Sequence, residues 1–148
     1  MTIRSTAGTP SSAEPPAPEG PDVSALLGDW LNTDRGAVSK GPLRLTVAEC
    51  GKGLSVRALG SPAAAGRSPA GRQPRDWGEA PAAVYTAPGA PSVAWSFCAV
   101  YELGDLRTVL SAYYKTGILV TTASSVPLDG GGPGEWTRSF FHRAEEAV

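Results

Sequence analysis

Length, composition and charge limit what this chain can be. Its 148 residues suit one domain, and 41% of them are hydrophobic, which is enough for a core and too many for a disordered chain. The formal net charge is only −1 and the 13 basic residues are scattered, so we expect neither nucleic acid nor an anionic membrane as a partner.

The N-terminal residues 1–22 are rich in Pro, Ala, Ser and Gly and contain no apolar run. Such a segment cannot bury enough surface to offset its ordering entropy, so we expect a disordered tail followed by one folded domain over residues 23–148. The segment also lacks the features of a secretory signal or a membrane anchor, which favours a cytoplasmic protein. Cys50 and Cys98 are then expected as free thiols, with one disulfide between them as the alternative.

The first strands are indicated by alternating apolar and polar residues. Val23–Leu27 fits a single helical turn, and Gly28–Asn32 fits a strand directly after it. Apolar side chains then recur at every second position in Leu43–Val47 and again in Leu54–Ala58. Glu49–Gly53 lies between these two runs and contains two glycines, so we expect the clearest β-hairpin of the chain here.

Residues 60–75 form a low-complexity segment rich in Gly, Pro, Ala and Arg. We expect a long loop here, and long loops in compact domains are usually functional or disordered. This loop and the N-terminal tail are therefore candidates for covering the open end of a barrel.

Five further strand segments follow the loop, separated by short turns. They are Val84–Thr86, Val93–Tyr101, Arg107–Tyr114, Ile118–Ala123 and Glu135–His142. Connections this short cannot hold a crossover helix, so sequential strands should be antiparallel. The sequence therefore predicts an all-β domain, a single eight-stranded antiparallel up-and-down barrel, with a β-sandwich as the alternative. A barrel of about eight strands can be filled by side chains or can hold one small ligand.

The segment Leu27–Asn32 (LGDWLN) resembles the G-x-W motif on the first strand of the calycins, the group of lipocalins, fatty-acid-binding proteins and avidins. The resemblance implies that Gly28 permits a close turn and that Trp30 plugs one end of the barrel. It also implies that a basic residue near the last strand, here Arg138 or Arg143, packs over the Trp30 indole.

A longer stretch, GDWLNTD…GPLRLTV…DWGE…GEWTRSFFHR, is similar to a largely uncharacterised bacterial family of small lipocalin-like domains. In that family the DWG element follows a short loop, whereas Asp76-Trp77-Gly78 here follows the long Pro-rich loop. The excess of Arg over Lys also fits a bacterial origin. A resemblance of this kind implies a fold and says little about activity.

Three strands carry the side chains that we expect to line a pocket. In strand 93–101 and in the last strand one face is more aromatic than the other, and we direct that face inward. Together with alternate positions of strand 107–114, this predicts an apolar cavity with a few polar groups. The predicted ligand-binding residues are Trp95, Phe97, Tyr101, Thr108, Leu110, Tyr114, Trp136 and Phe140, and Arg138 and His142 share the face of the last two. Ala58, Ala99 and Ala112 favour a cavity because they would underfill the interior; the alternative is that the aromatic side chains fill the barrel.

Groups suited to catalysis are few. Tyr101 and Tyr114 are the candidate catalytic residues, since their hydroxyls could hydrogen-bond to a ligand carbonyl in a dry cavity, and ordinary barrel packing is the alternative. His142 is the single histidine and is expected at the rim, so neither a metal site nor a catalytic triad is indicated, and no cofactor is expected. Asp76 and Glu79 could act as a carboxylate pair, but solvated loop charges are the simpler interpretation.

Three functions fit these features. The first is a cofactor-free cyclase or isomerase of secondary metabolism, in which an apolar pocket folds a flexible substrate for a cycloaddition or a similar ring closure. The second is a non-catalytic carrier or sensor of a small, largely apolar molecule. The third is a structural or interaction module with a filled barrel. The expected partner is a small apolar molecule, and a homodimer is left open.

Overall fold

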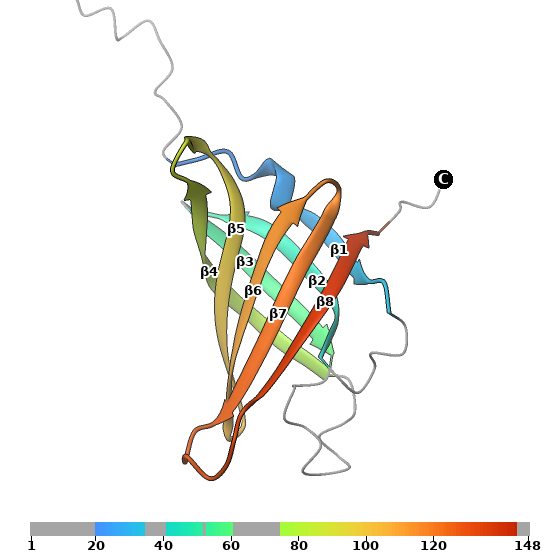
Figure 1. The fold of residues 1–148 in the computed structure, drawn as a ribbon, viewed down its shortest axis with the longest axis vertical. Coiled ribbons are helices and arrows are strands. Elements are labelled where there is room, and N and C mark those ends of the chain that lie inside the picture. The colour runs from blue at the N-terminus through green and yellow to red at the C-terminus, as the bar shows by residue number, and fades with distance from the viewer. Residues whose placement is uncertain (1–19, 35–40, 52, 61–74, 145–148) are drawn as a thin grey trace, which may run out of the picture.

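Eight strands close into a single antiparallel β-barrel in the computed structural model, which describes residues 20–34, 41–51, 53–60 and 75–144 (Figure 1). The strands pair in chain order, and the last strand returns to pair with the first. They are β1 (Gly28–Asn32), β2 (Pro42–Cys50), β3 (Gly53–Gly60), β4 (Arg75–Ala87), β5 (Ala90–Leu103), β6 (Leu106–Lys115), β7 (Ile118–Pro127) and β8 (Glu135–Arg143). The predicted fold class, an eight-stranded antiparallel barrel, is confirmed.

The described part of the chain contains little helix. The 3-10 helix η3 (Ser24–Leu26) precedes β1, where the sequence predicts a single helical turn. Within the described ranges, no helix has the length and apolar character needed to cross a membrane. Most of the predicted N-terminal tail and of the predicted 60–75 loop lies outside the described residues.

β4 is much longer than the sequence predicts. The predicted strand covers Val84–Thr86, whereas β4 runs from Arg75 to Ala87, so Trp77 lies on a strand. The alternation along β4 is hidden in the sequence because Gly78 and Pro81 are residue types that usually mark turns. Gly78 has a φ of +86° at a β-bulge, where β4 shifts its register against β3.

A second bulge reverses the orientation of the first half of β5. Tyr85 on β4 pairs with Ser96, and the next residue of β4, Thr86, pairs with Ala94, so Trp95 is the extra residue. Ala94 and Phe97 are both fully buried, whereas Trp95 is 40% exposed on the outer face. The predicted inward orientation of Trp95 is therefore wrong, because strict alternation does not continue across a bulge.

The face of β8 that points into the barrel is the opposite of the predicted one. Phe141 is fully buried, whereas Trp136 is 62% exposed and Phe140 is 45% exposed. The inner face carries Thr137, Ser139 and Phe141, and the outer face carries the side chains that were predicted to be inside, which are Trp136, Arg138, Phe140 and His142. Pairing fixes this orientation, since Phe141 lies opposite Asn32 on β1 and Leu119 on β7, and both of these partners are buried.

β6 follows the predicted alternation without interruption. Thr108, Leu110 and Ala112 are buried inside the barrel, and the residues between them lie on the outer face. β6 pairs with β7 over its full length, and with β5 from Leu106 to Tyr113, with no register shift. The faces of a regular strand can thus be read from period 2 alone.

Candidate ligand-binding site

One end of the barrel is closed around Trp30. Its side chain is fully buried, and the indole N–H donates a hydrogen bond to the carbonyl of Leu26 at 3.0 Å. The ring of Tyr114 meets Trp30 edge-on, with 6.3 Å between the centroids. The guanidinium of Arg143 lies over the indole, 4.3 Å from its centroid, which is a cation–π contact.

Arg143 also joins this closed end to the N-terminal part of the domain. Its guanidinium donates to the carbonyl of Leu27 and, at 2.7 Å, to the carbonyl of Ala25. Gly28 makes room for this arrangement, because a Cβ at that position would lie 2.9 Å from Arg143 Nη1, and its φ of +118° favours glycine. Arg138, the other arginine considered for this contact, instead lies over Phe140 on the outer face.

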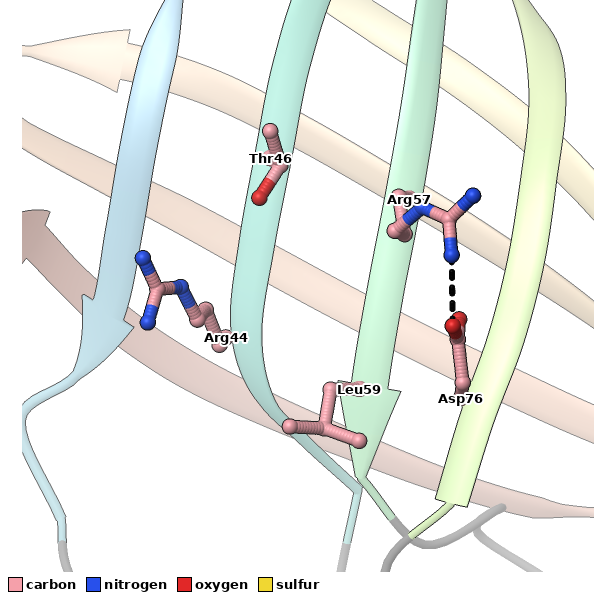
Figure 2. A pocket seen from close by; sticks show the side chains of 5 residues that line it. All are labelled: Arg44, Thr46, Arg57, Leu59 and Asp76. Carbon is pink, nitrogen blue, oxygen red and sulfur yellow. Dashed lines mark hydrogen bonds and ion pairs between the residues drawn. The ribbon is translucent and has the colours of Figure 1, made fainter.

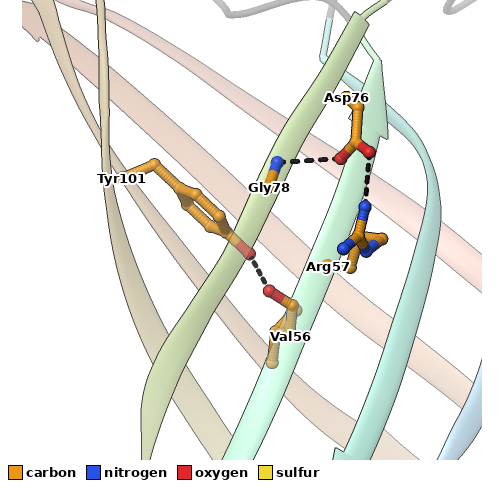
Figure 3. Close-up of polar contacts among 5 residues, drawn as sticks. All are labelled: Val56, Arg57, Asp76, Gly78 and Tyr101. Carbon is orange, nitrogen blue, oxygen red and sulfur yellow. Dashed lines mark hydrogen bonds and ion pairs between the residues drawn. The ribbon is translucent and has the colours of Figure 1, made fainter.

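A second tryptophan is buried where β3 ends and β4 begins, toward the opposite end of the barrel (Figure 1). The indole N–H of Trp77 donates to the carbonyl of Gly60 at 2.9 Å, and the ring of Tyr101 meets Trp77 edge-on at 5.4 Å. Figure 3 shows that the Tyr101 hydroxyl donates in turn to the carbonyl of Val56, at 2.5 Å. Gly60 must be glycine, because a Cβ there would clash with the carbonyl oxygen of Gly41.

The middle of the barrel is filled. Phe97, Thr108 and Leu110 have no exposed surface, and Ala99 and Ala112 expose 2% or less. A space large enough for a water molecule would leave exposed surface on the residues that line it, so no such space borders these side chains. The cavity predicted beside Phe97 and Leu110 is therefore not found there, and the alanines are covered by neighbouring side chains.

The inner wall of β6–β8 carries hydroxyl groups. They belong to Thr108, Thr121, Ser125, Thr137 and Ser139. Thr108 and Ser125 pair with each other at 2.6 Å, and Thr121 donates to the carbonyl of Ser139 at 3.4 Å. The Oγ1 atom of Thr137 is buried and has no hydrogen-bond partner in the part of the chain that the structure describes.

Thr137 and Ser139 differ from the other inward residues because they are only half-buried. Both precede the part of β8 that pairs with β1, since that pairing begins at Phe141, opposite Asn32. Water therefore reaches the inner wall of β8 beyond the end of β1. The aromatic content of β8 predicts these residues on the outer face, so the sequence does not single them out; Phe141, four positions after Thr137 and two after Ser139, is the apolar residue of their face that could locate them.

The predicted catalytic tyrosines do not converge on one site. Tyr101 lies beside Trp77, and Tyr114 lies beside Trp30 at the closed end. Burial raises the pKa of Tyr101 well above its usual value of 10.0, and its proton is committed to the Val56 carbonyl. His142 is exposed and makes its hydrogen bond with the carbonyl of Arg143.

A hollow of about 200 Å³ lies on the outer wall of β2–β4 (Figure 2). It is lined by Arg44, Thr46, Arg57, Leu59 and Asp76. Arg57 forms an ion pair with Asp76 at 2.5 Å, so Asp76 is part of a strand-to-strand pair rather than a loop carboxylate pair with Glu79. Both guanidiniums of this hollow are thus paired with a carboxylate, since Arg44 contacts Asp29 at 3.1 Å.

Asp29 is held in its charged form at this outer wall. A hydrogen bond from the Thr46 hydroxyl, at 2.6 Å, and then the neighbouring Arg44 lower the pKa of the Asp29 carboxyl. A larger hollow of about 550 Å³ lies near the closed end and is lined by residues that include Asp22, Ser24 and Glu49. Within the described residues, no three His, Cys, Asp or Glu side chains gather as they would around a metal ion.

No protein-family model matches the chain. No curated protein is significantly similar to it. The case for a function therefore depends on the geometry of the barrel.

Proposed function

We propose that this barrel binds a small, largely apolar molecule against the inner wall of β8, with a polar group of the ligand at Thr137. The observation that carries the proposal is that Thr137 is half-buried on this wall while its Oγ1 atom is covered and has no hydrogen-bond partner among the described residues, so a ligand that displaces what covers this atom can pair with it. A buried hydroxyl without a hydrogen bond costs about 1–3 kcal/mol, so a ligand that pairs with it recovers that free energy.

The surroundings of Thr137 support a largely apolar ligand. Across the β7–β8 pair, Thr137 lies opposite Ala123, which is a small apolar side chain on the inner wall. No charged side chain belongs to the inner positions of β8 between Glu135 and Phe141. A ligand carbonyl that accepts a hydrogen bond from Thr137, on an otherwise apolar molecule, fits this chemistry.

Between the two ligand-based functions, the geometry favours the non-catalytic carrier or sensor. The hydroxyl of Tyr101 is already donated to the backbone of Val56, so it is not available to polarise a carbonyl of a substrate. The cyclase or isomerase remains a prediction from the sequence. Cys50 and Cys98 form no disulfide, which supports a reducing, cytoplasmic location as part of the proposal.

The proposal can be tested with Nile red, an apolar dye that carries a carbonyl group. We expect saturable binding to the intact chain, followed by dye fluorescence, and about 5- to 10-fold weaker binding by Thr137→Val, which removes the hydroxyl at constant size. Thr122→Val is the matched control, because Thr122 lies on the outer face of the neighbouring strand. It should leave the affinity unchanged.

The unfolding free energy of the same variants separates loss of the site from loss of the fold. Thr137→Val should be no less stable than the wild type, since it removes an unpaired buried hydroxyl. A stable Thr137→Val that binds the dye as tightly as the wild type would show that Thr137 does not contact the ligand. Absence of saturable binding to the wild type would contradict the proposal as a whole.

A further inference from the structure

The outer wall of β5–β8 exposes an unusual amount of apolar surface. Trp136, Val100, Phe140 and Trp95 are 62%, 50%, 45% and 40% exposed, respectively. Trp95 and Val100 lie on the outside of β5, and Trp136 and Phe140 on the outside of β8, with β6 and β7 between them in the barrel wall. Scattered apolar residues on a surface are normal, but a contiguous set of this size marks an interaction site.

The register places these side chains in two rows that run across the strands. In the first row, Tyr113 on β6 pairs with Val120 on β7, which pairs with Phe140 on β8. The ring of Trp95 extends this row, because it meets Tyr113 edge-on at 5.6 Å.

The second row lies four residues along each strand from the first. It consists of Val100, Val109, Ser124 and Trp136, which pair in that order from β5 to β8. Between the two rows runs a middle row with the shorter side chains of Cys98, Ser111 and Thr122, ending at Arg138. The exposed apolar side chains of the two rows therefore lie on β5, β6 and β8, because Val120 on β7 is covered by its neighbours and Ser124 is polar, and a row of mostly shorter side chains runs between them.

Charge does not explain this wall. Within these three rows of described residues the single charged side chain is Arg138, and its guanidinium lies over Phe140 at 5.2 Å. At the border of the wall, Arg107 and Glu102 neutralise each other in an ion pair at 3.1 Å. A strongly charged partner would find no complementary field here, whereas a second apolar wall would lose little by desolvation.

We propose that the outer wall of β5–β8 is the interface of a homodimer, in which a second copy of this chain packs face to face on the first. In this arrangement, an apolar row of one copy packs against the middle row of the other copy. Successive outward rows are about 6.8 Å apart, since a strand rises roughly 3.4 Å per residue, so the two apolar rows are about 14 Å apart and leave room between them for one row of the partner. A two-fold axis makes both halves of such a contact equivalent.

The exposed area is close to what a dimer needs. Six large apolar side chains that are at least 40% exposed contribute here: Trp95, Val100, Val126, Trp136 and Phe140 of the wall, and Tyr85 of β4, which pairs with Ser96 at its border. Together they present roughly 600 Å², given about 150–250 Å² for a whole aromatic side chain. Stable dimer interfaces cover about 800 Å² on each partner, and the half-buried Val109 and Tyr113 add to this wall.

The oligomeric state of the intact chain tests this proposal. Sedimentation at protein concentrations from about 1 to 100 µM should give twice the chain mass of 15.2 kDa at the upper end. The double variant Trp136→Ser/Phe140→Ser should remain monomeric, or dimerise at least about 100-fold more weakly, since buried aromatic residues dominate interface energies. Leu59→Ser is the matched control, because Leu59 is 40% exposed on a different outer wall, and it should dimerise like the wild type.

A second variant is needed in case the double variant Trp136→Ser/Phe140→Ser does not fold. Thr122→Arg places a cation in the middle row without removing any apolar side chain, and it should also be monomeric while its circular dichroism stays unchanged. A wild-type chain that sediments as a monomer at 100 µM would overturn the proposal, whether the wall is then covered by residues 1–19 or by a different protein. A dimer that persists in both variants would place the interface elsewhere and would equally overturn it.

Discussion

The two ends of the barrel each carry a buried tryptophan with a tyrosine edge against it. Trp30 pairs with Tyr114 at one end, and Trp77 pairs with Tyr101 toward the other. In both cases the indole N–H donates to a backbone carbonyl, so neither tryptophan leaves a buried donor unpaired. The two ends therefore use the same solution for filling a barrel with a large side chain.

The difference between the ends is Arg143. Its contact with the carbonyl of Ala25 spans 118 positions of the sequence, and with the contact to the Trp30 indole it joins the last strand to the first strand and to the segment before it. Trp77, in contrast, is held by contacts with β3 and β5, which are the neighbours of its own strand. The contacts that hold Trp30 are thus also contacts that close the barrel, whereas those that hold Trp77 lie between strands that are neighbours in the sequence. For the ligand binding that we propose, entry at the Trp77 end would leave the closure between β1 and β8 intact.

Truncating the two tryptophans should give the largest effect. We expect Trp30→Ala to lower the unfolding free energy by about 5 kcal/mol, and Trp77→Ala by about 3 kcal/mol, within the range for buried aromatic side chains. The loss of unfolding free energy should be larger for Trp30→Ala, because this substitution also removes the ring on which Arg143 stacks. Urea unfolding followed by circular dichroism measures both values. Equal losses for the two variants would remove the proposed difference between the ends.

Part of this comparison was accessible from the sequence. The G-x-W pattern singles out Trp30, and the strict alternation of β6 correctly separates its inner from its outer residues. Trp77 was not recognised as a strand residue, because Gly78 and Pro81 interrupt the alternation of β4. Alternation can be read from a sequence only where no bulge adds a residue, and each of the strands β4 and β5 contains one.

The candidate site was harder to predict than the fold. On β8 the sequence offers two faces, and aromatic content favours the face with Trp136 and Phe140. The inner face is instead chosen by partners from distant strands, since Phe141 lies opposite Asn32 and Thr121 donates to the backbone of Ser139. Such pairings are set by the closure of the whole barrel, so no local pattern contains them.

Removing the charge of Arg143 should have the next largest effect. Arg143→Met keeps much of the apolar stem and removes the cation and its hydrogen bonds to Leu27 and Ala25, so we expect a loss of about 2 kcal/mol. Arg138→Met is the control, since Arg138 lies over the exposed Phe140, and it should cost less than about 0.5 kcal/mol. Thermal or urea unfolding of the two variants gives the comparison directly. A loss for Arg143→Met that is no larger than the loss for Arg138→Met would mean that Arg143 does not stabilise the Trp30 end.

The smallest effect should come from the two tyrosine hydroxyls, and it should again differ between the ends. Tyr101→Phe leaves the ring against Trp77 but removes the hydrogen bond to the Val56 carbonyl, so we expect a loss of about 1 kcal/mol at neutral pH. Tyr114→Phe should change stability by less than about 0.3 kcal/mol, because its hydroxyl makes no hydrogen bond with a described residue and only its ring contacts Trp30.

The pH dependence of these two variants separates a hydrogen bond from ring packing. The pKa of Tyr101 is raised by burial above its unfolded value of 10.0, so its hydroxyl stabilises the fold fully below pH 10 and loses that contribution as the pH rises further. The difference in unfolding free energy between the wild type and Tyr101→Phe should therefore shrink above about pH 10. A difference that stays constant from pH 7 to pH 11 would mean that the variant acts through ring packing, and that the Trp77 end does not depend on the bond to Val56.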